Sequence, residues 1–341
     1  MNKKFKQKRT TNMTRLIIFI TFISISTFSF SQKKNNEFKK EADSIIRAEF
    51  PRARTFNIEY ENAFARDFDS KLFDENFQTG TIENQKRINF SANIPFYKYK
   101  KWTFTASANY AYHQFDFKNI ENVSTTAAFN QNETADFHQI SGAISTTLFS
   151  SLFKKPLIYN ASLIIDGNEK GLERIKGLIG ASIILKRTAN TTITTGLIVF
   201  VDPTAQIPFF PTFSYNHKFK NSDWEFDFIL PQRILFRKPI ATKGRLSVGA
   251  EFGGNGFYVN VDAPNFPSVF EYSQLELKSG LTYEHKITDN VIATFKGGLV
   301  NYISNRLTEK GEPNKDYIYE NDQDMTGYFN VGISFNPFSK K

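Results

Sequence analysis

Residues 87–94, RINFSANI, alternate between polar and apolar side chains at every position. Side chains of a β-strand point to opposite faces with a period of two, so this pattern predicts a strand with one apolar face and one polar face. The same rhythm appears in WTFTASAN (residues 102–109) and WEFDFIL (residues 224–230). It returns about a dozen times after residue 50, and it predicts an all-β chain.

The first 31 residues have the pattern of an export signal. Six basic residues and no acidic residue precede a charge-free apolar run of 15 residues, Leu16 to Phe30. Small residues at 29 and 31 predict cleavage between Ser31 and Gln32. An uncleaved anchor is the alternative, although the run is shorter than the ~20 residues of a spanning helix. Met13 would open a more compact signal.

Charge and cysteine content exclude several classes of protein. The whole chain has 43 Lys and Arg against 34 Asp and Glu, but removal of the six basic residues of the signal leaves 37 against 34, or +3. This small excess gives no support for a nucleic-acid partner, which would need a basic stripe on the fold. The absence of cysteine excludes disulfides, thiolate metal sites and a lipid anchor on Cys. We expect no cofactor.

After residue 31, no apolar run approaches the length of a transmembrane helix. Only helices and closed barrels satisfy their backbone groups in lipid, so a membrane protein with this sequence must be a barrel. The soluble alternative is a large secreted sandwich. Aromatic residues gather at expected strand ends and favour the barrel, because such belts form at the headgroup level. They are Tyr97, Tyr99, Trp102, Tyr110, Tyr112, Trp224, Tyr258, Tyr272, Tyr283 and Tyr302.

The expected fold is a transmembrane antiparallel β-barrel of 14 strands, at residues 54–338. Twelve strands is the alternative, because the pair split at Pro231 and Gln232 is the least regular. A periplasmic segment at 32–53, with a short helix at 37–50, precedes the barrel. The strands are expected near 54–64, 86–96, 102–115, 136–149, 157–166, 174–186, 191–201, 209–218, 223–230, 232–238, 244–254, 269–284, 290–303 and 325–336.

Two kinds of connection alternate along the chain, as in outer-membrane barrels. Short basic connections are expected at 97–101, 151–156, 186–190, 218–223, 237–243 and 285–290. Longer ones are expected at 67–85, 118–135, 167–173, 202–208, 255–268 and 305–324. In the last strand, Phe329, Val331, Ile333 and Phe335 share one face, which resembles the signal read by barrel-assembly machinery.

Charged residues identify the polar face as the lumen, because Lys or Arg at the lipid midplane costs about 2–4 kcal/mol. In one strand the phase of the apolar residues slips, and a bulge near Ser273 and Gln274 would place Glu271, Glu276, Lys278 and Glu284 inside. The expected lumen charge network is Glu225, Asp227, Arg233, Arg237, Arg245, Glu251, Glu271, Glu276, Lys278 and Lys296. It is either a structural set of paired charges or a polar constriction that selects solutes. Earlier strands add Arg87, Arg174 and Lys176.

Signals for catalysis are weak. The four histidines, His113, His138, His217 and His285, form no metal-ligand pair such as HxxxH, and no GxSxG motif is present. A lipid hydrolase or transferase of the outer membrane would need a Ser nucleophile and a His base, for which His138 with Ser141 or Ser145 is the nearest candidate. We therefore expect no enzyme and assign no catalytic or metal-binding residue.

Residues 224–257, WEFDFILPQRILFRKPIATKGRLSVGAEFGGNGF, resemble a family of uncharacterised outer-membrane barrel proteins of Bacteroidota-type bacteria. The INFSANIPF segment and the Tyr-rich strand after it are similar to the same family. The resemblance would cover most of the chain from residue 54. It implies an outer-membrane location and a barrel fold, with no assigned activity.

Three functions remain open at this stage. The first is a narrow or gated channel for small solutes in a Gram-negative outer membrane, with residues 225–296 as its constriction. The second is a closed structural or binding barrel that presents the loops at 118–135 and 305–324. The third is the lipid-acting enzyme. The expected partners are outer-membrane lipid, barrel-assembly machinery during biogenesis, and small solutes.

Overall fold

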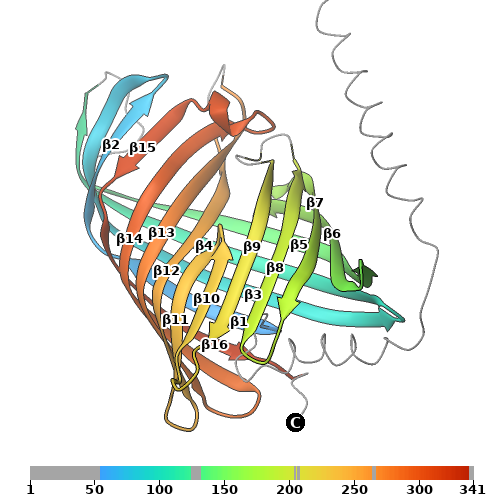
Figure 1. Cartoon of the computed structure of the whole chain (residues 1–341). Helices are drawn as coiled ribbons and strands as arrows, with labels where there is room; N and C mark the ends of the chain where they lie inside the picture. Colours follow the sequence, from blue (N-terminus) through green and yellow to red (C-terminus); the bar gives the residue numbers. More distant parts are fainter. Residues whose placement is uncertain (1–53, 124–131, 203–204, 206–207, 263–265, 338–341) are drawn as a thin grey trace, which may run out of the picture. The chain divides into compact units, whose positions relative to one another are not determined.

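The computed structural model describes residues 54–123, 132–202, 205, 208–262 and 266–337. The export signal and the short helix expected at 37–50 lie outside these residues. The described part of the chain is almost entirely antiparallel β-sheet (Figure 1). Within it, no helix has the length and apolar character needed to cross a membrane.

Strands form wherever the period-two alternation is sustained, and short turns join most of them. Their bounds are β1 Phe56–Ala63, β2 Arg66–Leu72, β3 Glu75–Tyr99, β4 Trp102–Asn122, β5 Glu133–Leu152, β6 Lys155–Asn168, β7 Gly171–Arg187, β8 Thr191–Val201, β9 Phe209–Lys218, β10 Glu225–Leu230, β11 Arg233–Ile240, β12 Gly244–Asn260, β13 Val269–Lys286, β14 Val291–Glu309, β15 Tyr319–Gln323 and β16 Thr326–Phe335. One 3₁₀ turn, η2 (Asn314–Asp316), precedes β15.

The sheet closes on itself because the first and last strands pair. β1 lies between β16 and β3, and the neighbours from β3 to β14 follow in chain order, which makes a ring of 14 strands. The remaining two strands extend members of this ring. β2 continues the register of β1 against β3, and β15 continues that of β16 against β14. The expected 14-stranded barrel is confirmed, and the alternative of 12 strands is wrong.

Both described ends of the chain lie at one end of the barrel, where the Thr55 amide donates to the Asn336 side chain at 2.9 Å. We call this the termini end, and the opposite end the loop end. Six connections at the termini end are short, as expected. The strands on either side of the longest connections, 123–132, 261–268 and 310–318, end at the loop end.

The connection expected at residues 67–85 is wrong. These residues form β2 and the first part of β3, joined by a turn at Phe73 and Asp74. They are strand because the alternation continues past the expected boundary, with Phe68, Phe77 and Ile82 buried on the inner side. At β2 and β3 the barrel wall therefore extends further toward the loop end than the strand bounds predicted from the sequence.

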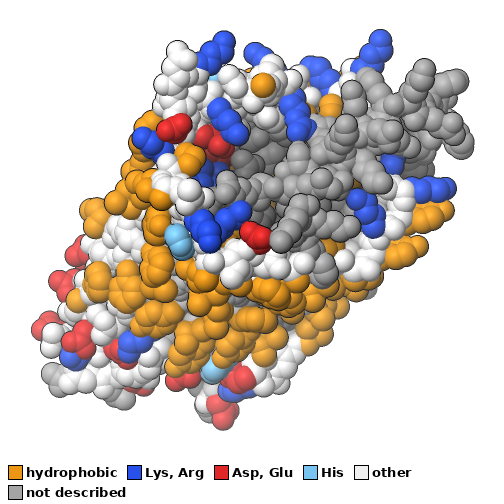
Figure 2. All heavy atoms as spheres, turned by 90° about the horizontal axis from the view of Figure 1, so that it is seen from below, with side chains coloured by type: hydrophobic (Ala, Val, Ile, Leu, Met, Phe, Trp, Pro, Cys, Tyr) orange, Lys and Arg blue, Asp and Glu red, His pale blue; other side chains and the backbone are white. Residues whose placement is uncertain are grey.

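The two faces of the wall differ as the alternation predicts. Ile144 and Leu163 point outward and are 61% and 59% exposed, whereas Ser145 and Ser162 point inward and share a hydrogen bond of 2.8 Å. A broad apolar band crosses the face drawn in Figure 2, and charged side chains gather toward its ends. In the last strand, Phe329, Val331, Ile333 and Phe335 are all exposed on the outer face, which confirms the expected pattern.

The aromatic belt is confirmed only in part. Tyr97, Tyr99 and Trp102 are exposed at the termini end, where a belt would meet the headgroups. Tyr258, Tyr272 and Tyr302 are buried inside the barrel, so their assignment to the belt is wrong. They lie on β12, β13 and β14, whose loop-end halves carry apolar groups on the inner side as well.

Replacement of Ile144 with arginine tests which face meets lipid. Because Ile144 lies midway along the exposed apolar run of β5, Ile144→Arg should lower the free energy of unfolding from vesicles by about 2–4 kcal/mol. Ile144→Leu, measured in the same urea titration, should change it by less than about 1.5 kcal/mol. A protein that exposed this position to water would tolerate both changes, and that result would contradict the membrane face.

Candidate functional site: the charged lumen and the chamber beneath the β12–β13 hairpin

Four charged side chains meet inside the barrel near the closure of the ring. Arg87 of β3 contacts Glu61 of β1 at 3.0 Å and Glu276 of β13 at 2.7 Å. Lys278 of β13 contacts the same two carboxylates, at 2.5 Å and 3.0 Å. Each cation thus bridges both carboxylates, which is the arrangement that makes buried charges tolerable in a low-dielectric interior. We call these four residues the closure cluster.

Amide side chains lie beside the closure cluster and hydrogen-bond to two of its members, Arg87 and Glu61. Gln274 accepts from Arg87 at 3.3 Å and from Gln85 at 3.2 Å. Gln85 also accepts from Arg66 at 2.5 Å, and the Arg66 guanidinium lies 4.4 Å from the centre of the Tyr302 ring. These polar contacts fill the part of the lumen beside β1, β3, β13 and β14.

Further ion pairs line the termini end of the lumen. Asp227 of β10 contacts Arg233 at 2.9 Å and Arg237 at 2.6 Å, both on β11. Glu284 pairs with Arg245 at 2.5 Å and also with Arg54. Lys296 lies 3.3 Å from Glu251. A cavity of about 350 Å³ opens among these side chains.

In the loop-end half of the β12–β13 hairpin, β12 separates from β11 while β13 stays paired with β14, and the hairpin bends across the lumen. β12 pairs with β11 only as far as Glu251, and its last contact is the hydrogen bond of 2.7 Å from the Phe252 amide to the Gln232 carbonyl. Gly253, Gly254 and Gly256 follow directly, and glycine lets a strand bend at such a point.

Contacts on the far wall hold the crossing hairpin in place. The Phe257 ring stacks on Phe137 of β5, with centroids 4.3 Å apart. The Tyr258 hydroxyl donates to Asp166 of β6 at 3.0 Å, and Asn168 donates to Asn260 at 2.6 Å. These contacts divide the loop-end half of the interior into two cavities, one on each side of the hairpin.

Glu271 reaches the lumen by a route that sequence alone did not indicate. The register between β12 and β13 is uninterrupted, and the irregularity predicted near Ser273 and Gln274 is found one residue further along, between Leu275 and Glu276. The register shift lies between β13 and β14, where Ile303 is the additional residue. Glu271 therefore faces away from the Glu276 side of β13. It pairs with Arg174 and lies 3.6 Å from Lys176, both on the far wall, because the hairpin crosses to them.

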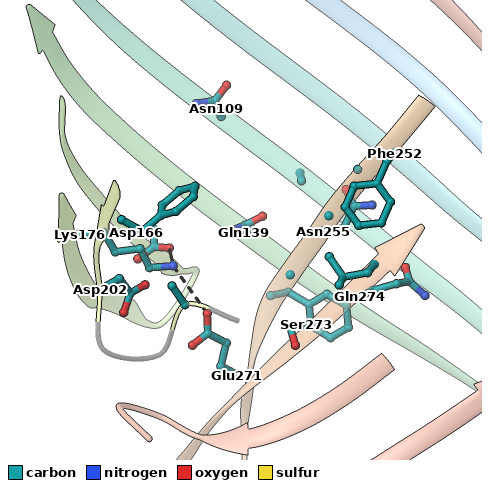
Figure 3. Close-up of a pocket in the computed structure, with 18 of the residues that line it drawn as sticks. Asn109, Gln139, Asp166, Lys176, Asp202, Phe252, Asn255, Glu271, Ser273 and Gln274 are labelled. Carbon is teal, nitrogen blue, oxygen red and sulfur yellow. Dashed lines mark ion pairs between the residues drawn. The ribbon is translucent and has the colours of Figure 1, made fainter. Parts of the chain in front are cut away.

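The larger cavity beneath the hairpin has a volume of about 820 Å³, and we call it the chamber. Figure 3 shows Lys176 between Asp166 and Glu271 on one side, with Asn109 and Gln139 on the neighbouring strands. Lys176 contacts Asp166 at 2.7 Å. Ile198, Phe200 and Phe210 add an apolar side to the same chamber.

A further cavity, of about 310 Å³, shares lining residues with both the chamber and the cavity at the termini end, and we call it the middle cavity. It shares Glu59, Arg233, Glu251 and Lys296 with the termini-end cavity. It shares Asn89, Gln232 and the glycine bend of β12 with the chamber. The termini-end cavity, the middle cavity and the chamber therefore follow one another along the lumen. Arg233, Glu251 and Lys296 line both the termini-end cavity and the middle cavity.

The barrel wall is interrupted beside the chamber. The β10–β11 hairpin ends at Leu230, which pairs with Phe213, while β9 continues to Phe209. From Phe213 toward the loop end, β9 has no described partner strand on the edge that faces β12. From Phe252 toward the loop end, β12 likewise has none on the edge that faces β9. Pro211, which has no N–H to leave unpaired, occupies the open edge of β9.

The ten residues expected in the lumen network occupy three places. Glu276 and Lys278 belong to the closure cluster, and Glu271 lies at the chamber. Glu225, Asp227, Arg233, Arg237, Arg245, Glu251 and Lys296 line the termini end, where Glu225 accepts a hydrogen bond from Asn216. Glu59 and Glu61 also belong to the lumen, although the expected network did not include them; the exposed Ile58 and Tyr60 carry the alternation that points both carboxylates inward.

The histidine–serine pair considered for catalysis does not form. His138 shares the outward parity of Ile140 and Ile144, and its Nδ1 hydrogen-bonds the Tyr110 hydroxyl at 2.9 Å. Ser141 and Ser145 point to the lumen, so the wall separates them from the imidazole. Among the described residues, no group of three His, Asp or Glu side chains is placed to hold a metal ion.

Comparison with known proteins gives a weak likeness of fold alone. No protein-family model and no curated protein matches the chain. An outer-membrane channel from Pseudomonas putida F1 aligns over 84% of this chain and 97% of its own, at 9% identity and a TM-score of 0.35. The toluene transporter of P. putida aligns over 85% and 91%, at 7% and 0.32. Outer membrane phospholipase A of Escherichia coli aligns over 86% and 98%, at 10% and 0.30.

Removal of Arg87 should destabilise the barrel strongly, because Glu61 and Glu276 would remain buried with Lys278 as their shared cation. Arg87→Met should lower the free energy of unfolding by about 3–5 kcal/mol. The matched control is Arg306→Met, since Arg306 pairs with Glu320 at 2.8 Å in a half-exposed position. That loss should be about 0–1 kcal/mol. Equal losses in urea titrations would show that the closure cluster has no special weight.

Proposed function

We propose that this chain is an outer-membrane β-barrel that forms a narrow channel for small solutes. The series of three cavities along the lumen carries this proposal, because each shares lining residues with the next. The apolar outer band and the closed ring support the membrane location. Between the termini end and Leu230, each described strand of the ring is paired on both sides, as a strand in lipid must be.

An even number of strands keeps both ends of the barrel domain on one side of the membrane. We assign the termini end to the periplasm and the loop end to the outside, as is usual for barrels with short periplasmic turns. We further propose that residues 1–31 are a cleaved signal, that residues 32–53 remain in the periplasm, and that assembly machinery reads the aromatic strand β16. We also propose that the chain is related to the outer-membrane barrel proteins of Bacteroidota-type bacteria that it resembles.

The narrow point of the channel lies where the termini-end cavity meets the middle cavity. Arg233, Lys296 and Glu251 line both cavities, so a solute must pass charges of both signs. Rings of charged side chains select ions in pores by sign and by size. Asp227 holds Arg233 through an ion pair of 2.9 Å, and Glu251 and Lys296 pair with each other at 3.3 Å.

Reversal potentials across planar bilayers test the position of the constriction. In a KCl gradient, Arg233→Ala and Lys296→Ala should each shift selectivity toward K⁺, and Glu251→Gln should shift it toward Cl⁻. Arg233→Ala should also raise the single-channel conductance, because it removes the larger side chain. Lys310→Ala is the control, since Lys310 pairs with Glu173 at 2.7 Å at the loop end. It should match the wild type.

The alternative is a closed barrel with a structural or binding role at its loops. The completeness of the closure cluster favours it, because the same ion pairs that line the lumen also fill it. Folded protein that inserts into the bilayer and passes no current, in wild type and in Arg233→Ala alike, would support the closed barrel. We propose no enzymatic reaction, because His138 and the two serines lie on opposite faces of the wall.

A further inference from the structure

A separate apolar cavity of about 430 Å³ lies at the loop end, on the other side of the crossing hairpin from the chamber. Aromatic rings dominate its lining, among them Phe77, Phe117, Phe137, Phe257 and Tyr272. It shares no residue with the middle or termini-end cavities, and Phe257 is among the residues that separate it from the chamber. Its volume lies within the range of about 300–1,000 Å³ that is usual for small-molecule sites.

The cavity walls are fixed by ring contacts between strands. Phe257 packs on Tyr272 with centroids 4.7 Å apart, and Phe68 meets Phe117 edge-on at 5.8 Å. These residues, with Ile82 and Phe115, form the main apolar cluster of the barrel. Both strand extensions, β2 and β15, contribute side chains to the lining, so the cavity exists because the wall rises above the ring at this point.

A fully buried acceptor in this apolar lining lacks a hydrogen-bond partner. Asn321 of β15 is 4% exposed, and its amide nitrogen donates to the Tyr319 hydroxyl at 3.0 Å. Its Oδ1 accepts no hydrogen bond from any residue that the structure describes. The neighbouring acceptor, Gln323 Oε1, is already bound by Arg66 at 2.7 Å. A buried acceptor without a donor is unfavourable, and such groups in native proteins call for a partner.

We propose that this cavity binds a small apolar molecule that carries one hydrogen-bond donor, such as a phenol or naphthol. The aromatic lining takes the hydrocarbon body, and Asn321 Oδ1 accepts the hydroxyl proton. A charged group finds no counter-charge among the described residues, because none of the Lys, Arg, Asp or Glu side chains that the structure describes lines the cavity. The site is independent of the proposed channel, since none of the constriction residues contributes to it.

Equilibrium dialysis with 1-naphthol and naphthalene tests the two parts of this recognition separately. The full mature chain is reconstituted in phosphatidylcholine vesicles, and binding to protein-free vesicles is subtracted. Asn321→Val should weaken 1-naphthol about five- to tenfold, the effect of one lost hydrogen bond, and should leave naphthalene unchanged or slightly tighter. An equal loss of both ligands, or of neither, would overturn the role of Asn321.

A second pair of variants on β12 tests the cavity itself. Val259 lines the cavity, so Val259→Phe should fill part of it and should weaken both ligands at least tenfold. Val248, on the outer face of the same strand, gives the control, and Val248→Phe should bind both ligands as the wild type does. Saturable binding that Val259→Phe leaves intact would overturn the proposal.

Conductance measurements on the same variants distinguish failure of the proposed ligand site from failure of the proposed channel. Val259→Phe should retain the wild-type conductance and unfolding transition, because the substitution lies outside the constriction. Loss of ligand binding with an intact unfolding transition would therefore support the site, whether or not the barrel conducts. Wild-type protein that folds but binds 1-naphthol no better than protein-free vesicles would overturn it, again independently of conductance.

Discussion

The structure depends on the pairing of its first strand with its last. A strand in lipid has no water to satisfy its N–H and C=O groups, so the ring must close. Closure brings Phe56 opposite Phe335 and continues in one register from β1 and β16 into β2 and β15. Once the ring is closed, every side chain is committed to lipid or to lumen, and a slip of one residue would exchange the two faces.

That commitment explains the chemistry of the interior. Charges that cannot face lipid meet inside, and the closure cluster joins Glu61 from the first strand to Arg87, Glu276 and Lys278 from strands distant in the chain. The same pairs that stabilise the closed ring narrow the passage through it. In the proposed channel, stability and conduction would therefore be coupled through a few buried ions, and both proposed roles of the charged wall follow from one arrangement.

The sequence was sufficient to predict the strands, because each needs only local alternation. β8 and β9 have the expected bounds, and all 14 strands of the ring were predicted. The tertiary detail was not predictable, because it depends on pairing between distant strands. The additional residue Ile303 appears only in the register of β13 with β14, and the meeting of Glu271 with Arg174 requires a hairpin that bends across the lumen. Tyr302 is buried in the lumen, yet the sequence around it has the same alternation as that around an exposed tyrosine of the belt.

The short β10–β11 hairpin gives the chamber an unusual boundary. Leu230 ends the hairpin at the level of Phe213, and β9 continues toward the loop end to the exposed Phe209. In a bilayer, acyl chains would complete the wall at this height. The chamber would then have one liquid side, whose polarity and order belong to the surrounding lipid. Membrane thickness and acyl-chain saturation would become variables of the protein's interior, alongside its own residues.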